Sequence, residues 1–193
     1  EQYYDYLRYM PVSGRDGEVV LDYGCGPGHD LVGFSERSKP ARLIGIDVSK
    51  PSLAEAAKRL ALHAAEAELL HVDEDAPRLP LPDASVDHVH SSGVLHHVPD
   101  PVRVLRELRR VLRPDGRMRL MIYNRDCIWF HLFSAYTVRF TQNVRAPGGG
   151  RLAVEDAFRR STDTADCPIS HAWTPADVST LAAKAGFRVR HLG

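Results

Sequence analysis

The stretch VVLDYGCGPG, residues 19–28, decides the fold. Its apolar start is typical of a buried strand, its three glycines follow at every second position, and a helical pattern begins directly behind them. Glycines are needed at such a turn where a ligand lies against the backbone, because a Cβ atom would occupy the same volume. The first N–H groups of the following helix are also free to bind a ligand. We therefore predict a ligand-binding turn here, with a tight turn that binds nothing as the alternative.

Short apolar runs and longer helical stretches continue to alternate up to residue 123, which is typical of a parallel α/β sheet. Ser49 is the expected N-cap of the second helix, with Pro51 in its first turn. A further helix from Thr174 to Gly186 is predicted near the end of the chain. The predicted strands are 18–23, 42–46, 68–72, 86–91, 117–123 and 187–192, and the first three predicted helices are 28–37, 51–63 and 101–112. The predicted fold class is a doubly wound, mostly parallel α/β sheet with a helical or irregular insertion after the fifth strand.

The 193 residues are expected to form a single domain. Within it we distinguish a core at 18–123, an insertion at 124–171, and a last helix and strand at 172–193. Because the chain starts at Glu1 inside a helical pattern, we expect it to be a trimmed form of a longer protein.

Charge and cysteine content exclude several classes of protein. The formal net charge is zero, which argues against a broad grip on nucleic acid or on a lipid surface. No apolar run approaches the ~18 residues that a membrane span requires. Cys25, Cys127 and Cys167 have no paired spacing, so we expect neither a disulfide framework nor a metal site. A reducing, cytoplasmic compartment is the expected location.

Two acids accompany the glycine turn. Asp22 precedes the first glycine, and a carboxylate there would repel a pyrophosphate but suit a cationic or hydrogen-bond-donating ligand. The glycine spacing, Gly-x-Gly-x-Gly, also differs from the Gly-x-Gly-x-x-Gly of dinucleotide-binding proteins. Asp47 ends the second predicted strand, where a carboxylate can accept both hydroxyls of a ribose.

Four segments, in order, carry a more specific resemblance. They are LDYGCGPG at 21–28 with GID at 45–47, DAPRLPLPDASVD at 75–87, SSGVLHH at 91–97 and LRPDG at 112–116. Together they resemble the class I S-adenosylmethionine-dependent methyltransferases, in particular the small-molecule branch called type 11.

The resemblance implies a set of cofactor contacts. Asp22 would bind the ammonium end of S-adenosylmethionine and Asp47 its ribose hydroxyls. Asp75 would accept a hydrogen bond from the adenine amino group. The resemblance implies further contacts, some of them through the backbone: Gly24, Cys25, Gly26, Val48, Ala76 and Ser92. Tyr4 is a further candidate contact, from a flap that precedes the sheet. Asp73 is the alternative to Asp75 as the residue that binds the adenine amino group.

The acceptor is expected beyond the carboxyl ends of the strands. His97, before His96, is the candidate general base, because histidine titrates in the useful pH range. The alternative is that both histidines serve only loop structure and cofactor contact.

Trp129, Phe133, Tyr136 and Phe140 fall on one helical face of the insertion. They form either a lid over the acceptor or a face packed on the sheet or in a homodimer. The arginine-rich helix at 101–112 is interpreted as a solvated face, because it lacks the interleaved aromatic residues of nucleic-acid binding.

The sequence thus predicts methyl transfer from S-adenosylmethionine to a small-molecule acceptor, most readily at oxygen. A nicotinamide-dependent oxidoreductase and a non-catalytic cofactor-binding partner subunit are the alternatives.

Overall fold

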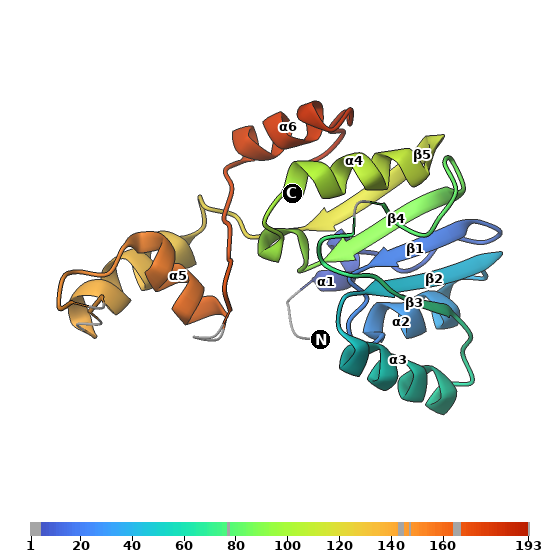
Figure 1. Ribbon diagram of the computed structural model, residues 1–193, viewed down its shortest axis with the longest axis horizontal. Helices are drawn as coiled ribbons and strands as arrows, with labels where there is room; N and C mark the ends of the chain where they lie inside the picture. The colour runs from blue at the N-terminus through green and yellow to red at the C-terminus, as the bar shows by residue number, and fades with distance from the viewer. Residues whose placement is uncertain (1–4, 77, 143–144, 147, 164–166, 193) are drawn as a thin grey trace. The chain divides into compact units, whose positions relative to one another are not determined.

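The computed structural model describes residues 5–76, 78–142, 145–146, 148–163 and 167–192 (Figure 1). The chain forms two compact units. The first unit is built from Glu1–Val94 and Arg103–Met121, and the second from Leu95–Val102 and Ile122–Leu192.

The first unit contains a five-stranded sheet in the order β3-β2-β1-β4-β5, in which every neighbouring pair is parallel. Because β1 has β2 on one side and β4 on the other, the strand order reverses beside it, and ligands of such sheets bind at this point, outside the carboxyl ends of the strands. The strands are β1 Val19–Tyr23, β2 Arg42–Asp47, β3 Glu68–His71, β4 Val86–Ser92 and β5 Leu112–Met121. The predicted parallel α/β fold is confirmed.

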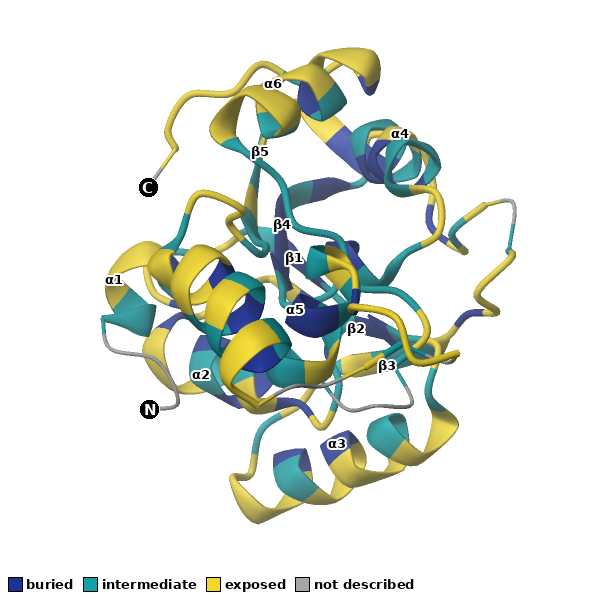
Figure 2. Cartoon of the chain, turned by 90° about the vertical axis from the view of Figure 1, so that its left-hand side faces the viewer, coloured by how far each residue is buried: buried dark blue, intermediate teal, exposed yellow. Residues whose placement is uncertain are grey.

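Helices flank this sheet (Figure 1). Helices α2 and α3 pack on each other beside β2, and Phe34 and Leu31 of α2 are fully buried in the core. The interior of β1 and most of β4 are buried as well (Figure 2). As predicted, the Ser49 hydroxyl caps α3 by accepting a hydrogen bond from the Ser52 N–H at 3.2 Å. The helices are α1 Tyr6–Tyr9, α2 His29–Arg37, α3 Lys50–Leu62 and α4 Pro101–Val111.

The fifth strand differs from the prediction in its bounds. It begins at Leu112, directly after α4, and ends at Met121, so that Ile122 and Tyr123 lie outside it. The pairing with β4 jumps from Val86–Leu112 to His88–Arg117, so residues 113–116 form an irregularity within the strand. The Pro-Asp-Gly sequence interrupts the pairing of β5 with β4, which resumes at Arg117.

Among its described residues, the second unit contains helices and irregular segments joined by two isolated β-bridges. Its elements are η1 Leu95–His97, η2 Trp129–Thr141, α5 Val154–Thr162 and α6 Pro175–Lys184. η2 is a π-helix that buries Phe130, Ser134 and Val138 at four-residue spacing, and η2 packs against α5. As the sequence predicts, α6 begins directly after Thr174 and Gly186 follows its end; Thr174 forms a capping box with Asp177, and Gly186 has a φ of +81°.

The predicted strand at 187–192 is wrong. Phe187 donates its N–H back to Ala182 of α6, and residues 188–192 are exposed and pair with no strand among the described residues. The alternating apolar residues suggested a strand, but alternation alone cannot supply a hydrogen-bonding neighbour or a face to bury.

No helix among the described residues is both long enough and apolar enough to cross a membrane.

Candidate functional site

The glycine turn follows β1 and is fixed to the end of β2. The N–H groups of Gly24 and Cys25 both donate to the Ile46 carbonyl, at 2.7 and 3.0 Å. A Cβ atom at Gly24 would lie 2.2 Å from the Val94 side chain, so packing alone requires that glycine. At Gly26 the same position meets nothing within 4 Å, although its φ is +50°. The turn therefore leaves open space beside Gly26, where a ligand can approach the backbone.

Asp47 connects this turn to the end of β2. Its Oδ2 accepts the Gly26 N–H at 2.8 Å, and its Oδ1 accepts the Ser49 N–H at 2.7 Å. Each carboxylate oxygen has a further lone pair, and the side chain is only half-buried. The carboxylate is therefore held in a fixed orientation beside the open face of Gly26, as a ribose-binding acid would be.

Asp22 lies in the middle of the sheet and is 2% exposed. Burial, together with the neighbouring carboxylates of Asp30 and Asp47, raises its pKa to about 7, although the charge of His90 acts in the opposite direction. A buried acid with such a pKa is stabilised in its charged form by a cation. This environment fits the ammonium group that the resemblance assigns to it.

Next to Asp22 lies a buried polar network that the sequence analysis did not find. Asp30 Oδ2 accepts the Tyr6 hydroxyl at 2.6 Å and lies 3.1 Å from Nε2 of the fully buried His90. Burial opposes the charge on Asp30, but the hydrogen bonds and charge of His90 and the Tyr6 hydroxyl lower its pKa overall. The register pairs His90 with Asp22, so only strand pairing could have indicated the network.

The turn at residues 73–76 contains the predicted adenine contacts. Asp75 is exposed, and the N–H of Ala76 donates to the Asp73 carbonyl at 3.0 Å rather than pointing free. Arg103 of α4 holds this turn by donating to the carbonyls of Glu74, Asp75 and Ala76 at 3.0–3.1 Å. Arg103 is thus not merely part of a solvated helix face. It fixes the backbone from which Asp75 projects.

The other predicted cofactor contacts lie in the same unit. Cys25 is 7% exposed, and its burial raises the pKa of the thiol, so only its backbone suits a ligand. Val48 is half exposed beside Asp47, and Ser92 ends β4 with its hydroxyl 3.9 Å from the Met121 sulfur. Tyr4 lies outside the described residues.

The two histidines of η1, in the second unit, have different environments. His96 is 1% exposed and stacks on Tyr123 with ring centroids 3.7 Å apart. Its burial, and the nearby charge of His97, lower its pKa to about 3. Such an imidazole is neutral at physiological pH and a weak base.

The His97 side chain is 36% exposed. Its Nδ1 lies 2.9 Å from the Ile169 carbonyl, which can only accept, so this hydrogen bond requires a proton on Nδ1; in the neutral imidazole the lone pair is then on Nε2. Nε2 lies 3.7 Å from Oδ1 of Asp163, which accepts the Tyr123 hydroxyl at 2.8 Å. Sequence reasoning missed Asp163, because it lies more than sixty residues away in the insertion.

The aromatic residues of η2 form two stacked pairs, Trp129 on Phe133 at 4.2 Å and Tyr136 on Phe140 at 5.7 Å between centroids. Trp129, Tyr136 and Phe140 are 43–58% exposed, whereas Phe133 is partly buried and packs against the core cluster of Val138, Leu152 and Ala157. Three residues of the predicted aromatic stripe are therefore exposed on the surface of their unit, and the fourth packs on its core.

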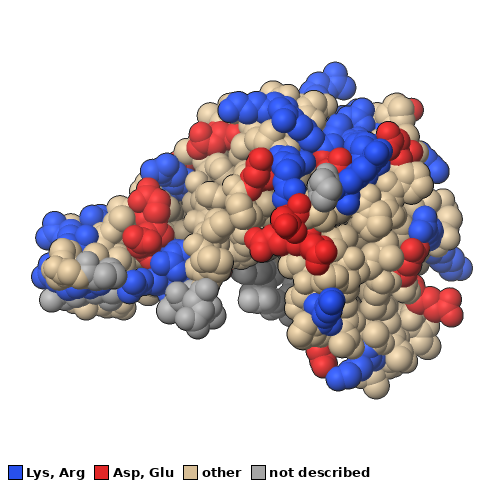
Figure 3. Space-filling view, in the orientation of Figure 1, with Lys and Arg blue, Asp and Glu red and all other residues tan. Residues whose placement is uncertain are grey.

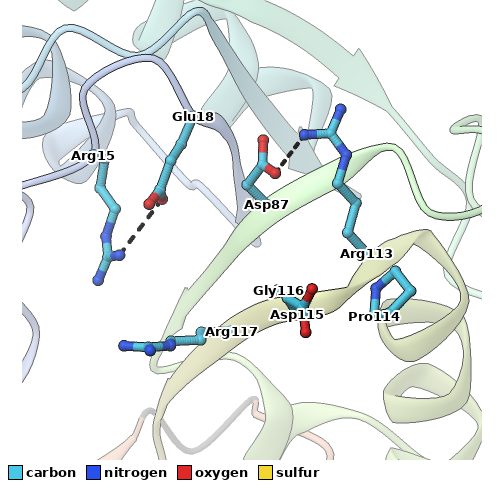
Figure 4. A pocket seen from close by; sticks show the side chains of 8 residues that line it. All are labelled: Arg15, Glu18, Asp87, Arg113, Pro114, Asp115, Gly116 and Arg117. Carbon is cyan, nitrogen blue, oxygen red and sulfur yellow. Dashed lines mark hydrogen bonds and ion pairs between the residues drawn. The ribbon is translucent and has the colours of Figure 1, made fainter.

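Charged side chains of both signs are mixed on the face shown in Figure 3. A cavity of about 530 Å³ lies at the amino ends of β1, β4 and β5, the opposite edge of the sheet from the glycine turn (Figure 4). It contains as many acids as arginines, and Arg113 is paired with Asp87 there. This cavity is separate from the candidate cofactor site.

A parallel sheet in this order, with a glycine turn and two acids at the carboxyl ends of β1 and β2, is the arrangement at which α/β proteins commonly bind nucleoside-containing cofactors. The family model described as a methyltransferase domain matches residues 21–120. The chain belongs to this family, and within it to the class I, S-adenosylmethionine-dependent type that its motifs resemble.

The chain is also similar to individual proteins. The chain is 45% identical over 109 residues to an uncharacterised 37.1 kDa protein in transposon Tn4556 of Streptomyces fradiae, covering 55% of this chain and 30% of that protein. It is 36% identical over 106 residues to 27-O-demethylrifamycin SV methyltransferase of Amycolatopsis mediterranei, covering 55% of this chain and 39% of that enzyme. The matches thus span less than half of these relatives' lengths.

A solved S-adenosylmethionine-dependent methyltransferase from Mesorhizobium loti shares the fold with a TM-score of 0.68 and 24% identity, over 97% of this chain and 82% of that one.

Proposed function

We propose that the first unit binds S-adenosylmethionine and that the chain transfers its methyl group to the oxygen of a small-molecule acceptor. The observation that carries the proposal is the contact between Asp47 and Gly26, which holds a ribose-binding acid beside the one glycine of the turn with open space. The name of the Amycolatopsis relative indicates an oxygen acceptor for that enzyme, which supports oxygen here.

Bound S-adenosylmethionine supplies a methyl group that is already activated by the sulfonium charge. Asp22 would bind the ammonium group, Asp47 the ribose hydroxyls, and the turn held by Arg103 the adenine. Backbone groups of Gly24 and Cys25, together with Val48, Ala76 and Ser92, would complete the cofactor contacts. The protein's part is then mainly to align the acceptor and to accept its proton.

For the proton we propose His97 rather than His96. The free lone pair on Nε2 and the exposure of the His97 side chain suit a general base, whereas His96 is buried and its pKa is about 3. The Ile169 carbonyl would keep Nδ1 protonated, and the Asp163 carboxylate would stabilise the imidazolium formed after proton transfer. The exposed aromatic surface of η2 would contact the acceptor.

Calorimetry with S-adenosylhomocysteine and NAD, each titrated separately, tests the binding step. We expect saturable binding of S-adenosylhomocysteine and none of NAD, whereas the reverse would favour the oxidoreductase alternative. Methyl transfer is then tested with isotopically labelled cofactor and a metabolite extract, with products identified by mass spectrometry. Binding without transfer to any acceptor in a broad panel would support the non-catalytic alternative instead.

A further inference from the structure

A buried imidazole lies beside the acid to which we assign the cofactor's ammonium group. His90 of β4 is fully buried, and strand register pairs it with Asp22 of β1, which is 2% exposed. We propose that His90 is a positioning residue for that ammonium group: its charged ring, held by Asp30 and Tyr6, keeps Asp22 in the carboxylate form that attracts a cation. This inference rests on the proposed binding of S-adenosylmethionine.

The imidazole ring is held by contacts from α1 and α2. Its Nε2 lies 3.1 Å from Asp30 Oδ2, and the Tyr6 hydroxyl donates to the same oxygen at 2.6 Å. Although burial opposes the charge on Asp30, its hydrogen bonds with His90 and Tyr6 and the charge of His90 lower its pKa. Asp30 is therefore a carboxylate that can only accept, so its hydrogen bond with His90 requires a proton on Nε2. Phe34 packs perpendicular to the ring, with centroids 5.2 Å apart.

A charged ring at this position has two acids to balance. Buried charges are stable where an opposite charge and hydrogen bonds accompany them. Burial raises the pKa of Asp22, the charge of His90 lowers it, and the carboxylates of Asp30 and Asp47 raise it again, with a result of about 7. The imidazolium would thus offset the charge of one of the two acids beside it, Asp22 and Asp30. The cofactor's ammonium group would offset the other.

The other ionisable groups around His90 do not supply that positive charge. His88 lies two residues earlier in the same strand, and its burial lowers its pKa to about 3, so it is neutral at physiological pH. Arg119 of β5 pairs with His90 in register, but its side chain is exposed and its guanidinium donates to the Tyr9 carbonyl at 2.9 Å. Burial and the hydrogen bond to Asp30 raise the pKa of the Tyr6 hydroxyl, which therefore stays a neutral donor.

The first test needs no cofactor and uses the whole chain. Nitrogen NMR of the ring, assigned with His90→Gln, should show both nitrogens of His90 protonated at pH 7. Carboxyl-carbon NMR should find the pKa of Asp22 at about 8 or higher in His90→Phe, because a nearby opposite charge lowers a carboxyl pKa by roughly 1–3. His88→Phe is the matched control, since it replaces an equally buried imidazole of the same strand, and it should leave the pKa of Asp22 unchanged.

The second test links His90 to the cofactor site by calorimetry with S-adenosylhomocysteine, which carries the same ammonium group. His90→Phe should weaken binding by about fivefold or more at pH 7, because the charged fraction of Asp22 falls from about half to about a tenth. The difference should shrink toward pH 9, where more of Asp22 is charged. His90→Gln keeps an N–H donor for Asp30 but no charge, so it should behave like His90→Phe, whereas His88→Phe should bind like the wild type.

Circular dichroism of each variant separates these effects from loss of fold, and His90→Gln serves if His90→Phe does not fold. A neutral His90 ring at pH 7 would overturn the inference. So would a folded His90→Gln with the wild-type pH profile, because the hydrogen bond to Asp30 alone would then suffice. If the wild type failed to bind S-adenosylhomocysteine, the proposed function would fail, while the pKa of Asp22 in the variants would still show whether His90 sets its charge.

Discussion

The two units place their functional groups by different means. In the first, the acids Asp22 and Asp47 belong to adjacent strands, and Asp47 is oriented by the backbone of the glycine turn that follows Asp22. In the second, His97 and Asp163 come from segments far apart in the chain, and their partners, the Ile169 carbonyl and the Tyr123 hydroxyl, come from two further segments. A local sequence motif identifies the first site, whereas the residues of the second site come together only when the chain folds.

The largest effect is expected from the second unit. His97→Ala should lower turnover by about 10²–10⁴-fold, because no general base would then take the proton of the methylated hydroxyl, while cofactor affinity stays within about twofold. Single-turnover kinetics and calorimetry measure the two effects. His131→Ala, an exposed histidine of the same unit, is the control. Retention of most of the turnover would reject His97 as base.

Asp47→Ala should have the largest effect on the first unit. It should weaken binding of S-adenosylhomocysteine by about 1–3 kcal/mol, because charge-assisted hydrogen bonds are lost and the N–H groups of Gly26 and Ser49 lose their acceptor. Calorimetry on the folded variant measures this, with Asp115→Ala as a control at the opposite edge of the sheet. An unchanged affinity would remove Asp47 from the site.

The pKa of Asp22, about 7, makes cofactor binding pH-dependent. Because the ammonium group favours the charged carboxylate, binding releases a proton below that pH, so affinity should fall by about tenfold from pH 8 to pH 6 and level off above pH 8. Asp22→Asn should remove this pH dependence of cofactor affinity. Calorimetric titrations of both proteins between pH 5.5 and 8.5 measure it, and an affinity that changes equally with pH in both would contradict the prediction.

The same shift affects the stability of the cofactor-free protein. Between about pH 4 and 7 the folded state holds a proton on Asp22 that the unfolded chain releases, so the contribution of Asp22 to stability decreases as pH rises through this window. Urea denaturation at several pH values, with Asp22→Asn as reference, measures the difference.

Arg103→Met should weaken cofactor binding by a few-fold to about tenfold, because residues 74–76 lose the donors that hold their carbonyls. Arg117→Met, an exposed arginine of the same unit, is the control. Equal affinities of the two variants would show that the turn holds its conformation without Arg103.

The smallest effect is expected at the exposed aromatic surface of η2. Trp129→Ala should raise the KM of the acceptor by a few-fold, because it removes exposed apolar contact area, and should leave cofactor affinity unchanged, because the proposed cofactor contacts lie in the first unit. Steady-state kinetics with either substrate varied measures this. A changed oligomeric state with normal kinetic constants would favour a dimer interface instead.

Several features were determined by the sequence alone. The parallel α/β fold, the caps at Ser49 and Thr174, and the position of the glycine turn depend on neighbouring residues and their periodicity, which a sequence displays directly. The alternating apolar residues at 187–192 wrongly predicted a strand, because a strand also requires a neighbouring strand with which to pair. The bounds of β5 were wrong because they too depend on pairing with a neighbour: the pairing with β4 extends across the Pro-Asp-Gly irregularity.

Only the tertiary structure decided the charge states and partners of the site. The pKa of Asp22 results from burial between two strands; strand register places His90 beside it, and helix α2 brings Asp30 to His90. His97 and Asp163, which lie close together in the second unit, are more than sixty residues apart in the sequence. Burial, distance and dielectric environment depend on all the residues that surround a group in space, and the sequence shows only those beside it in the chain.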